Sequence, residues 1–263
     1  MSPLLRVSLT TGRRSTIGWG IWIAAVAVVY SAFYPSISSS AADLNKYMQN
    51  LPDAVKTIIG NDYTSPAGYL RAEFFSLLGP ILLLVYTIGG GAKAIAGEEE
   101  GRSLDLLLST PLSRGRVVAD KASSLLVTTV AITAFSFLVI IVVGPPFDLS
   151  VPVADVAAAC VMFLLLGLTF GSLALAVGCF SGRRTWAIAV AGVIGVATYL
   201  LNAVAPTVSA ISWARPLSPF RWYLEPDPLT TGLNAKNVLV LAASVAVFTA
   251  VAVWAFRRRD LAA

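Results

Sequence analysis

Six long apolar runs constrain this chain of 263 residues more than any other feature of its sequence. A bilayer core about 30 Å thick is crossed by roughly 20 helical residues, each adding about 1.5 Å. The runs that reach this length are residues 17–34, 74–96, 124–144, 156–180, 185–205 and 237–256. They do not alternate apolar with polar residues, as the strands of a membrane β-barrel would. The sequence therefore predicts an all-α polytopic membrane protein, with residues 1–263 forming a single transmembrane domain.

Basic residues set the expected orientation, because lysine and arginine are enriched in cytoplasmic loops. Six helices put both termini on one side, together with the loops near residues 97–121 and 181–184. That side carries Arg6, Arg13, Arg14, Lys93, Arg102, Arg114, Arg116, Lys121, Arg183, Arg184, Arg257, Arg258 and Arg259. The opposite side carries Lys46, Lys56, Arg71, Arg215, Arg221 and Lys236. We therefore expect a multi-pass protein of the cell membrane with both termini in the cytoplasm.

The net charge of +5 is explained by this topology and does not indicate a nucleic-acid partner. The basic residues are spread over four cytoplasmic pieces and lack the interleaved aromatic residues on which bases would stack. The apolar run after Arg13-Arg14 is longer than that of a signal peptide, so it predicts an uncleaved first helix. Residues 1–16 have the pattern of a short helix lying in the membrane interface, and a disordered N-terminus is the alternative.

The two long loops on the outer side also carry apolar patterns. Residues 43–60 predict two short amphipathic helices, which either pack against the bundle or line a substrate exit. Residues 213–237 are rich in proline and aromatic residues, and this segment is too apolar for a free linker. We expect it to dip back into the outer leaflet.

Glycines mark positions where helices are expected to come close together. Gly89-Gly90-Gly91 ends the second apolar run, and each glycine costs a helix about 1 kcal/mol relative to alanine. Close packing between helices is the first explanation, and a flexible joint that transmits movement is the second. The fourth run contains Gly167 and Gly171 in a GxxxG spacing, which predicts packing without naming the partner helix.

The sequence offers no catalytic, cofactor-binding or metal-ligating group that we can identify. It contains no histidine and no phosphate-binding glycine loop. Cys160 and Cys179 are 19 residues apart on one predicted helix, roughly 28 Å, which is too far for a disulfide within the chain. Apart from Lys93 near an end, where the side chain can snorkel, the apolar runs lack the charges of an ion-coupled carrier.

The stretch between the second and third apolar runs is densely charged. It reads Gly97-Glu98-Glu99-Glu100-Gly101-Arg102-Ser103-Leu104-Asp105-Leu106-Leu107-Leu108-Ser109-Thr110-Pro111-Leu112-Ser113-Arg114. Leu104, Leu107 and Leu108 lie at i, i+3 and i+4, so a short helix here would present one apolar face to a groove on a partner. A helix lying on lipid headgroups is the alternative, which the anionic triplet disfavours at an anionic leaflet.

This stretch resembles the loop between helices two and three of ABC type 2 permeases, the membrane subunits of a class of ATP-binding-cassette exporters. The family pattern is an acidic cluster, Gly-Thr-Leu, an acidic residue, two or three leucines and Pro-x-Ser-Arg. Arg102-Ser103-Leu104 departs slightly from that pattern. Six helices, a cytoplasmic N-terminus and Ser218-Pro219-Phe220 before the last helix extend the resemblance over essentially the whole chain.

The resemblance implies that this loop is a coupling helix that docks on a cytoplasmic ATP-binding-cassette ATPase. The residues to which the role is carried over are Glu98, Glu99, Glu100, Arg102, Leu104, Asp105, Leu107, Leu108, Pro111 and Arg114. It further implies a dimer with a second permease copy in membrane lipid. ATP and magnesium would be bound by the ATPase and not by this chain.

Export of an amphipathic drug, antibiotic or lipid, as in multidrug efflux, is the function that the resemblance implies. A non-transporting membrane scaffold or sensor that recruits a cytoplasmic ATPase is the second hypothesis. A membrane-embedded transferase is the third, and the missing catalytic groups disfavour it.

Overall fold

The computed structural model describes residues 3–41, 62–101 and 113–259, and these ranges are helical and contain no strands. Within them, six helices are long and apolar enough to cross a membrane, which confirms the predicted all-α polytopic fold. They are α1 (Pro3–Ser39), a rod spanning Pro66–Glu100, α8 (Arg114–Val143), α9 (Val153–Ser181), α10 (Arg184–Val204) and α13 (Ala235–Arg258).

The rod Pro66–Glu100 is one helix whose hydrogen-bond register changes along its length. It consists of α4 (Pro66–Leu70), the π-helical η1 (Arg71–Leu78), α5 (Gly79–Ala92), the π-helical η2 (Lys93–Gly97) and α6 (Glu98–Glu100). Ser65 begins the rod, because its side-chain oxygen accepts a 3.0 Å hydrogen bond from the backbone N–H of Gly68. Gly101 follows the last turn.

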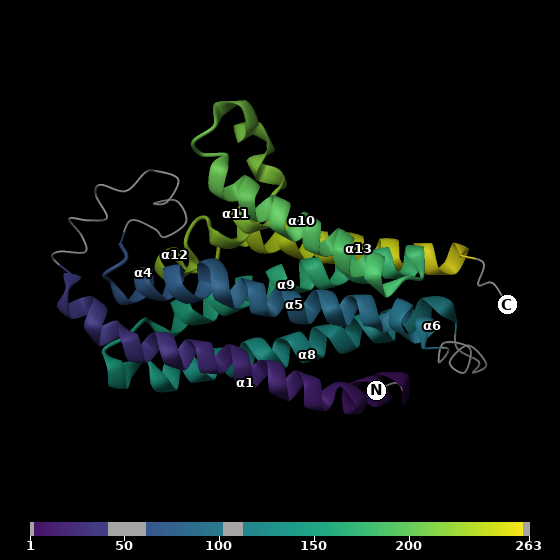
Figure 1. Cartoon of the computed structure of the whole chain (residues 1–263), viewed down its shortest axis with the longest axis horizontal. Coiled ribbons are helices and arrows are strands. Elements are labelled where there is room, and N and C mark those ends of the chain that lie inside the picture. The colour runs from purple at the N-terminus through teal and green to yellow at the C-terminus, as the bar shows by residue number, and fades with distance from the viewer. Residues whose placement is uncertain (1–2, 42–61, 102–112, 260–263) are drawn as a thin grey trace.

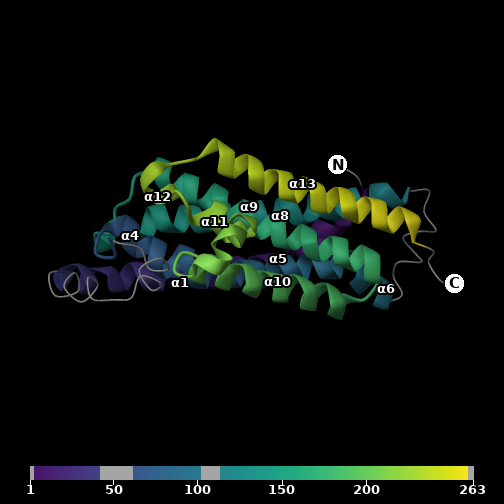
Figure 2. The same ribbon diagram turned by 90° about the horizontal axis from the view of Figure 1, so that it is seen from above.

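The long helices lie roughly parallel in layers (Figure 1). α1 and α8 pack together on one side, α5 and α9 lie in the middle, and α10 and α13 cover the other side, each against α9. The start of α1 and the end of α13 lie at the same end of the bundle as α6, which we call the α6 end (Figure 1). α4 and α12 (Pro228–Thr231) mark the opposite end, the α12 end (Figure 2).

α9 is the centre of the bundle. It is the most buried of the six membrane-length helices, and it contacts α5, α8, α10 and α13. Its glycines allow this close packing. A Cβ atom on Gly171 would lie 2.9 Å from Leu125 of α8 and 3.1 Å from Thr87 of α5. The GxxxG of α9 therefore packs against α5 and α8.

Gly91 lies on α5 where this helix packs against Gly171 of α9. A Cβ atom there would lie 2.1 Å from the carbonyl oxygen of Gly171, closer than any real contact, so the two backbones can meet only without a side chain. Gly89 differs, because no atom lies within 4 Å of a Cβ built on it. Close packing thus explains Gly91, and Gly89 faces open space.

The first helix is longer than its sequence predicts. Residues 3–16 do not form a separate interfacial helix, because α1 runs without a break to Ser39, a length of about 55 Å. Its first turns pack on the bundle, where Leu4 is buried beside Val117, Ile95 and Phe256. The hydroxyl of Thr16 also binds that of Tyr86 on α5 at 3.0 Å. Tertiary contacts thus hold the first turns of α1 against the bundle. The two short helices expected in residues 43–60 lie outside the described residues.

The segment before the last helix packs on the α12 end. It contains η4 (Ser209–Leu217), α11 (Pro219–Leu224) and α12, and Phe220, Tyr223 and Leu224 are buried. Asn237 at the start of α13 holds it by donating hydrogen bonds to the carbonyl oxygens of Trp222 at 2.7 Å and Glu225 at 2.6 Å.

Tyr223 completes the hydrogen bonding of the rod. At the end of η1 the N–H of Gly79 donates to the carbonyl of Phe74, one residue earlier than in an α-helix. In this register the carbonyl of Phe75 would need an N–H from residue 80, which is a proline and has none. The hydroxyl of Tyr223 donates to that carbonyl at 2.8 Å. A buried backbone group is thereby satisfied by a side chain from α11.

The glycine contact gives a direct stability test. We expect Gly91→Ala to lower the free energy of unfolding by about 1–3 kcal/mol, because α5 and α9 must separate to admit the methyl group. Gly89→Ala is the matched control. It should be neutral or stabilising by up to about 1 kcal/mol, because alanine favours the helix and meets no neighbour. Thermal unfolding of both variants in detergent measures the difference, and equal midpoints would contradict the packing argument.

Candidate functional site

The predicted docking residues begin at α6, where Glu98, Glu99 and Glu100 close the rod at the α6 end. Three acidic residues in one short turn repel one another unless each finds a separate partner. In the structure each of the three reaches a different part of the bundle.

Glu98 points toward α8. Its carboxylate accepts a hydrogen bond from the ammonium of Lys121, which also donates to the hydroxyl of Ser8 on α1 at 3.2 Å. The Lys121 side chain is only 8% exposed, so its charge lies mostly out of water and is stabilised by this ion pair. Through Lys121, Glu98 connects the rod to both α8 and α1.

Glu99 binds the end of the last helix. The guanidinium of Arg259 donates to both carboxylate oxygens of Glu99, at 2.9 and 2.5 Å, which is the bidentate geometry that arginine favours with carboxylates. The backbone carbonyl of Arg259 in turn accepts a 2.6 Å hydrogen bond from Arg114 at the start of α8. Arg259 thus joins Glu99 to Arg114, although the two lie on opposite sides of the loop in the sequence.

Glu100 binds the start of α10. Its carboxylate oxygen accepts a 2.8 Å hydrogen bond from the backbone N–H of Arg184, the first residue of that helix. The three glutamates therefore link the end of the rod to α8, α13 and α10. We call these contacts the glutamate hub, defined by Glu98, Glu99 and Glu100 with Lys121, Arg259 and the backbone of Arg184.

The structure brings four of the predicted docking residues together, namely the three glutamates and Arg114. The others, Arg102, Leu104, Asp105, Leu107, Leu108 and Pro111, lie outside the described residues. Sequence reasoning assigned the glutamates to a partner and missed their contacts within the chain. Arg259 and Lys121 were counted only as topology signals, and no local spacing links either one to its glutamate.

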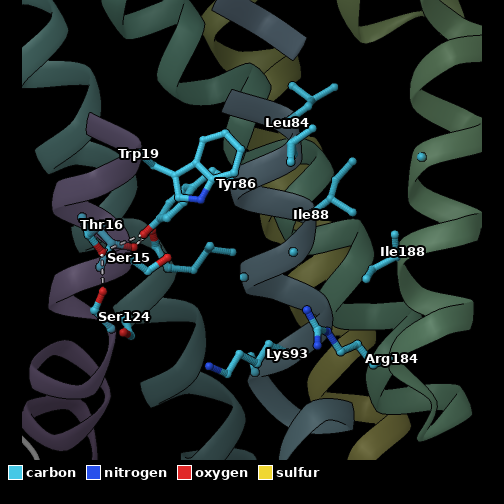
Figure 3. Close-up of a pocket in the computed structure, with 18 of the residues that line it drawn as sticks. Ser15, Thr16, Trp19, Leu84, Tyr86, Ile88, Lys93, Ser124, Arg184 and Ile188 are labelled. Carbon is cyan, nitrogen blue, oxygen red and sulfur yellow. Dashed lines mark hydrogen bonds between the residues drawn. The ribbon is translucent and has the colours of Figure 1, made fainter. Parts of the chain in front are cut away.

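A groove of about 860 Å³ lies beside the hub (Figure 3). It is bounded by α1, the rod, α8 and α10, and most of its lining is apolar. Trp19, Leu84, Ile88 and Ile188 line its middle, while Lys93 and Arg184 lie at its α6 end (Figure 3). Its size falls within the range of pockets that hold drug-sized ligands.

The residues that the structure describes show no sign of metal or disulfide chemistry. They contain no group of three or more cysteine, aspartate or glutamate residues placed to hold a metal ion. Cys160 and Cys179 are both buried as free thiols on α9, which confirms that they do not pair.

Residues 4–261 match the sequence profile of the ABC-2 family transporter proteins. The match spans nearly the whole chain, so the chain belongs to the ABC-2 transporter family and is a multi-pass membrane protein. This confirms the resemblance seen in the charged loop. A comparison with curated proteins gives no match.

The pair between Glu99 and Arg259 can be measured by a double-mutant cycle. We expect Glu99→Gln and Arg259→Gln to show a coupling energy of about 1 kcal/mol in unfolding, because both charges are partly buried and hydrogen-bonded. Arg258→Gln is the matched control. Arg258 is the neighbouring residue, and its guanidinium lies over the Trp254 ring at 4.9 Å, so it should not couple to Glu99. Equal coupling for both arginines would contradict the hub.

Proposed function

We propose that this chain is the permease subunit of an ATP-binding-cassette exporter and moves an amphipathic compound out of the cell. It would work as a dimer of permease copies with two cytoplasmic ATPase subunits, which bind ATP and magnesium. Membership of the ABC-2 transporter family supports this assignment. The observation that carries it further is the glutamate hub, which ties the proposed docking loop to three of the membrane-length helices.

The hub suggests how movement of the loop would reach the membrane. Residues 102–112 leave the rod directly after α6 and return at Ser113, the residue that caps α8. Both ends of this loop are therefore anchored, by the glutamates on one side and by Arg114 on the other. A displacement of the loop by an ATPase would be passed to the rod, α8, α10 and α13 together. The glutamates and Arg114 act in this proposal as positioning residues, and the leucine face contacts the ATPase.

The docking face is tested by charge substitution. We expect Leu107→Asp with Leu108→Asp to abolish co-purification of the partner ATPase. Burying such charges costs several kcal/mol each, against about 8 kcal/mol for a micromolar contact. Leu233→Asp is the control, because Leu233 is exposed at the α12 end and should leave binding unchanged.

The same complex tests transport. The intact complex should hydrolyse ATP faster when amphipathic substrate is present, and the double variant should not. Retained co-purification by the double variant would contradict docking through the leucine face. A complex that hydrolyses ATP while no compound crosses the membrane would favour the scaffold hypothesis instead.

The proposed orientation has its own test. With the α6 end in the cytoplasm, a cysteine at position 236 should react with a membrane-impermeant maleimide in intact cells, and one at position 183 only after lysis. Both positions are exposed, and the native Cys160 and Cys179 are buried, so background labelling should be low. The reverse pattern would place the glutamate hub outside the cell and contradict ATPase docking there.

A further inference from the structure

Two cationic side chains lie together at one end of the apolar groove. Lys93 begins η2 and Arg184 begins α10, and their stems meet over Gly97. A Cβ atom on Gly97 would lie 3.0 Å from Cγ of Lys93 and 3.8 Å from Cδ of Arg184. The missing side chain at Gly97 thus leaves room for both stems. Figure 3 shows both charged side chains at the groove end, beyond Ile88 and Ile188.

Neither cation takes part in an ion pair in the part of the chain that the structure describes. The nearby glutamates bind elsewhere, because Glu98 pairs with Lys121 and Glu100 accepts its hydrogen bond from the backbone of Arg184. Lys121 also lines the groove, but it is buried against Glu98. Glu98 also lines this end of the groove, but its charge is matched by that of Lys121, so Lys93 and Arg184 leave an excess of positive charge there.

The remainder of the groove suits a hydrocarbon chain. From Leu77 to Lys93 its wall follows the rod over 17 residues, a rise of about 24 Å, which is longer than the roughly 15 Å of hydrocarbon in one leaflet. Leu77, Ile81 and Val85 form an exposed apolar row along this wall, at a spacing of four residues. Val196 is exposed on the α10 side of the same groove. An apolar tail could therefore enter sideways from the membrane.

We propose that this groove binds an anionic amphiphile from the membrane, with its acidic headgroup on Lys93 and Arg184 and its tail along the rod and α10. The proposal rests on the proposed export function and names the charge of the compound that would be moved. Charge complementarity selects this occupant. A second copy of the chain packed over the groove would bury two cations without an anion, which is costly.

Photocrosslinking of the full chain tests the site. The probe is stearate with a diazirine on its chain, used at alkaline pH in nanodiscs of zwitterionic lipid, and the comparison compound is its methyl ester. We expect saturable labelling of α5 and α10 by the acid, which unlabelled stearate should reduce by competition. The concentration that gives half-maximal labelling should be about tenfold higher for the ester. Lys93→Gln and Arg184→Gln should each weaken labelling by the acid by about tenfold and leave labelling by the ester unchanged.

Arg183→Gln is the matched control, because Arg183 is the exposed neighbour of Arg184 and does not line the groove. The acid probe should label this variant to the same extent as it labels the unsubstituted chain. Lys93→Arg and Arg184→Lys keep the charge and should restore most of the binding, which separates loss of charge from misfolding. Equal labelling by acid and ester, or equal losses at Arg183 and Arg184, would overturn the proposal. The proposal would also be overturned if cysteines introduced at positions 81 and 85 crosslinked two copies of the chain and this crosslinking blocked labelling by the probe.

These results are independent of the export assay. The binding experiment uses the permease chain alone, whereas docking and transport require the ATPase. Selective binding of the acid by a chain that never supports transport would leave the groove site standing and refute the exporter. ATP-driven export with equal acid and ester labelling would support the exporter and refute the anionic site.

Discussion

The rest of the bundle depends on the backbone contact between α5 and α9. Inside a bilayer, lipid tails are as apolar as leucine, so helices associate mainly through close packing and hydrogen bonds. Gly91 and Gly171 permit that packing, because a methyl group on Gly91 would lie 2.1 Å from the carbonyl oxygen of Gly171. With α5 seated there, α9 becomes the central helix on which α8, α10 and α13 pack. The rod's position, and therefore that of α6, follows from this contact.

The rod is held to other helices at both of its ends. At the α12 end, the hydroxyl of Tyr223 bonds the Phe75 carbonyl that the π-helical register and Pro80 leave without a donor. At the α6 end, the glutamate hub binds three other helices by ion pairs and a backbone hydrogen bond. The α12 end also carries an ion pair, because Arg71 of η1 binds Asp227, the residue before α12, at 3.2 Å. Charged groups therefore hold the rod at both ends, and the neutral, buried bond of Tyr223 is added at the α12 end.

The sequence was sufficient to predict the elements and insufficient to predict their contacts. Apolar runs of membrane length identified all six helices, because backbone groups in a bilayer must be satisfied within each helix. The glycines indicated close packing but not its partner. Glu99 and Arg259 are 160 residues apart, and only the assembled bundle brings them together. α1 begins 14 residues before its apolar run because packing of Leu4, and not hydropathy, fixes its start. The groove was missed for the same reason, since its walls come from helices that are far apart in the sequence.

Lys93 and Lys121 show how position determines what a lysine can do. Both line one groove, yet Lys121 is buried and neutralised by Glu98, whereas Lys93 is exposed and shares its surroundings with Arg184. Snorkelling explains why Lys93 is tolerated but not why Arg184 lies beside it over Gly97. Glu100 supplies the connection, because the carboxylate that closes the rod holds the backbone of Arg184, whose side chain lines the groove. A displacement of α6 would therefore shift Arg184, one of the two groove cations, together with the start of α10.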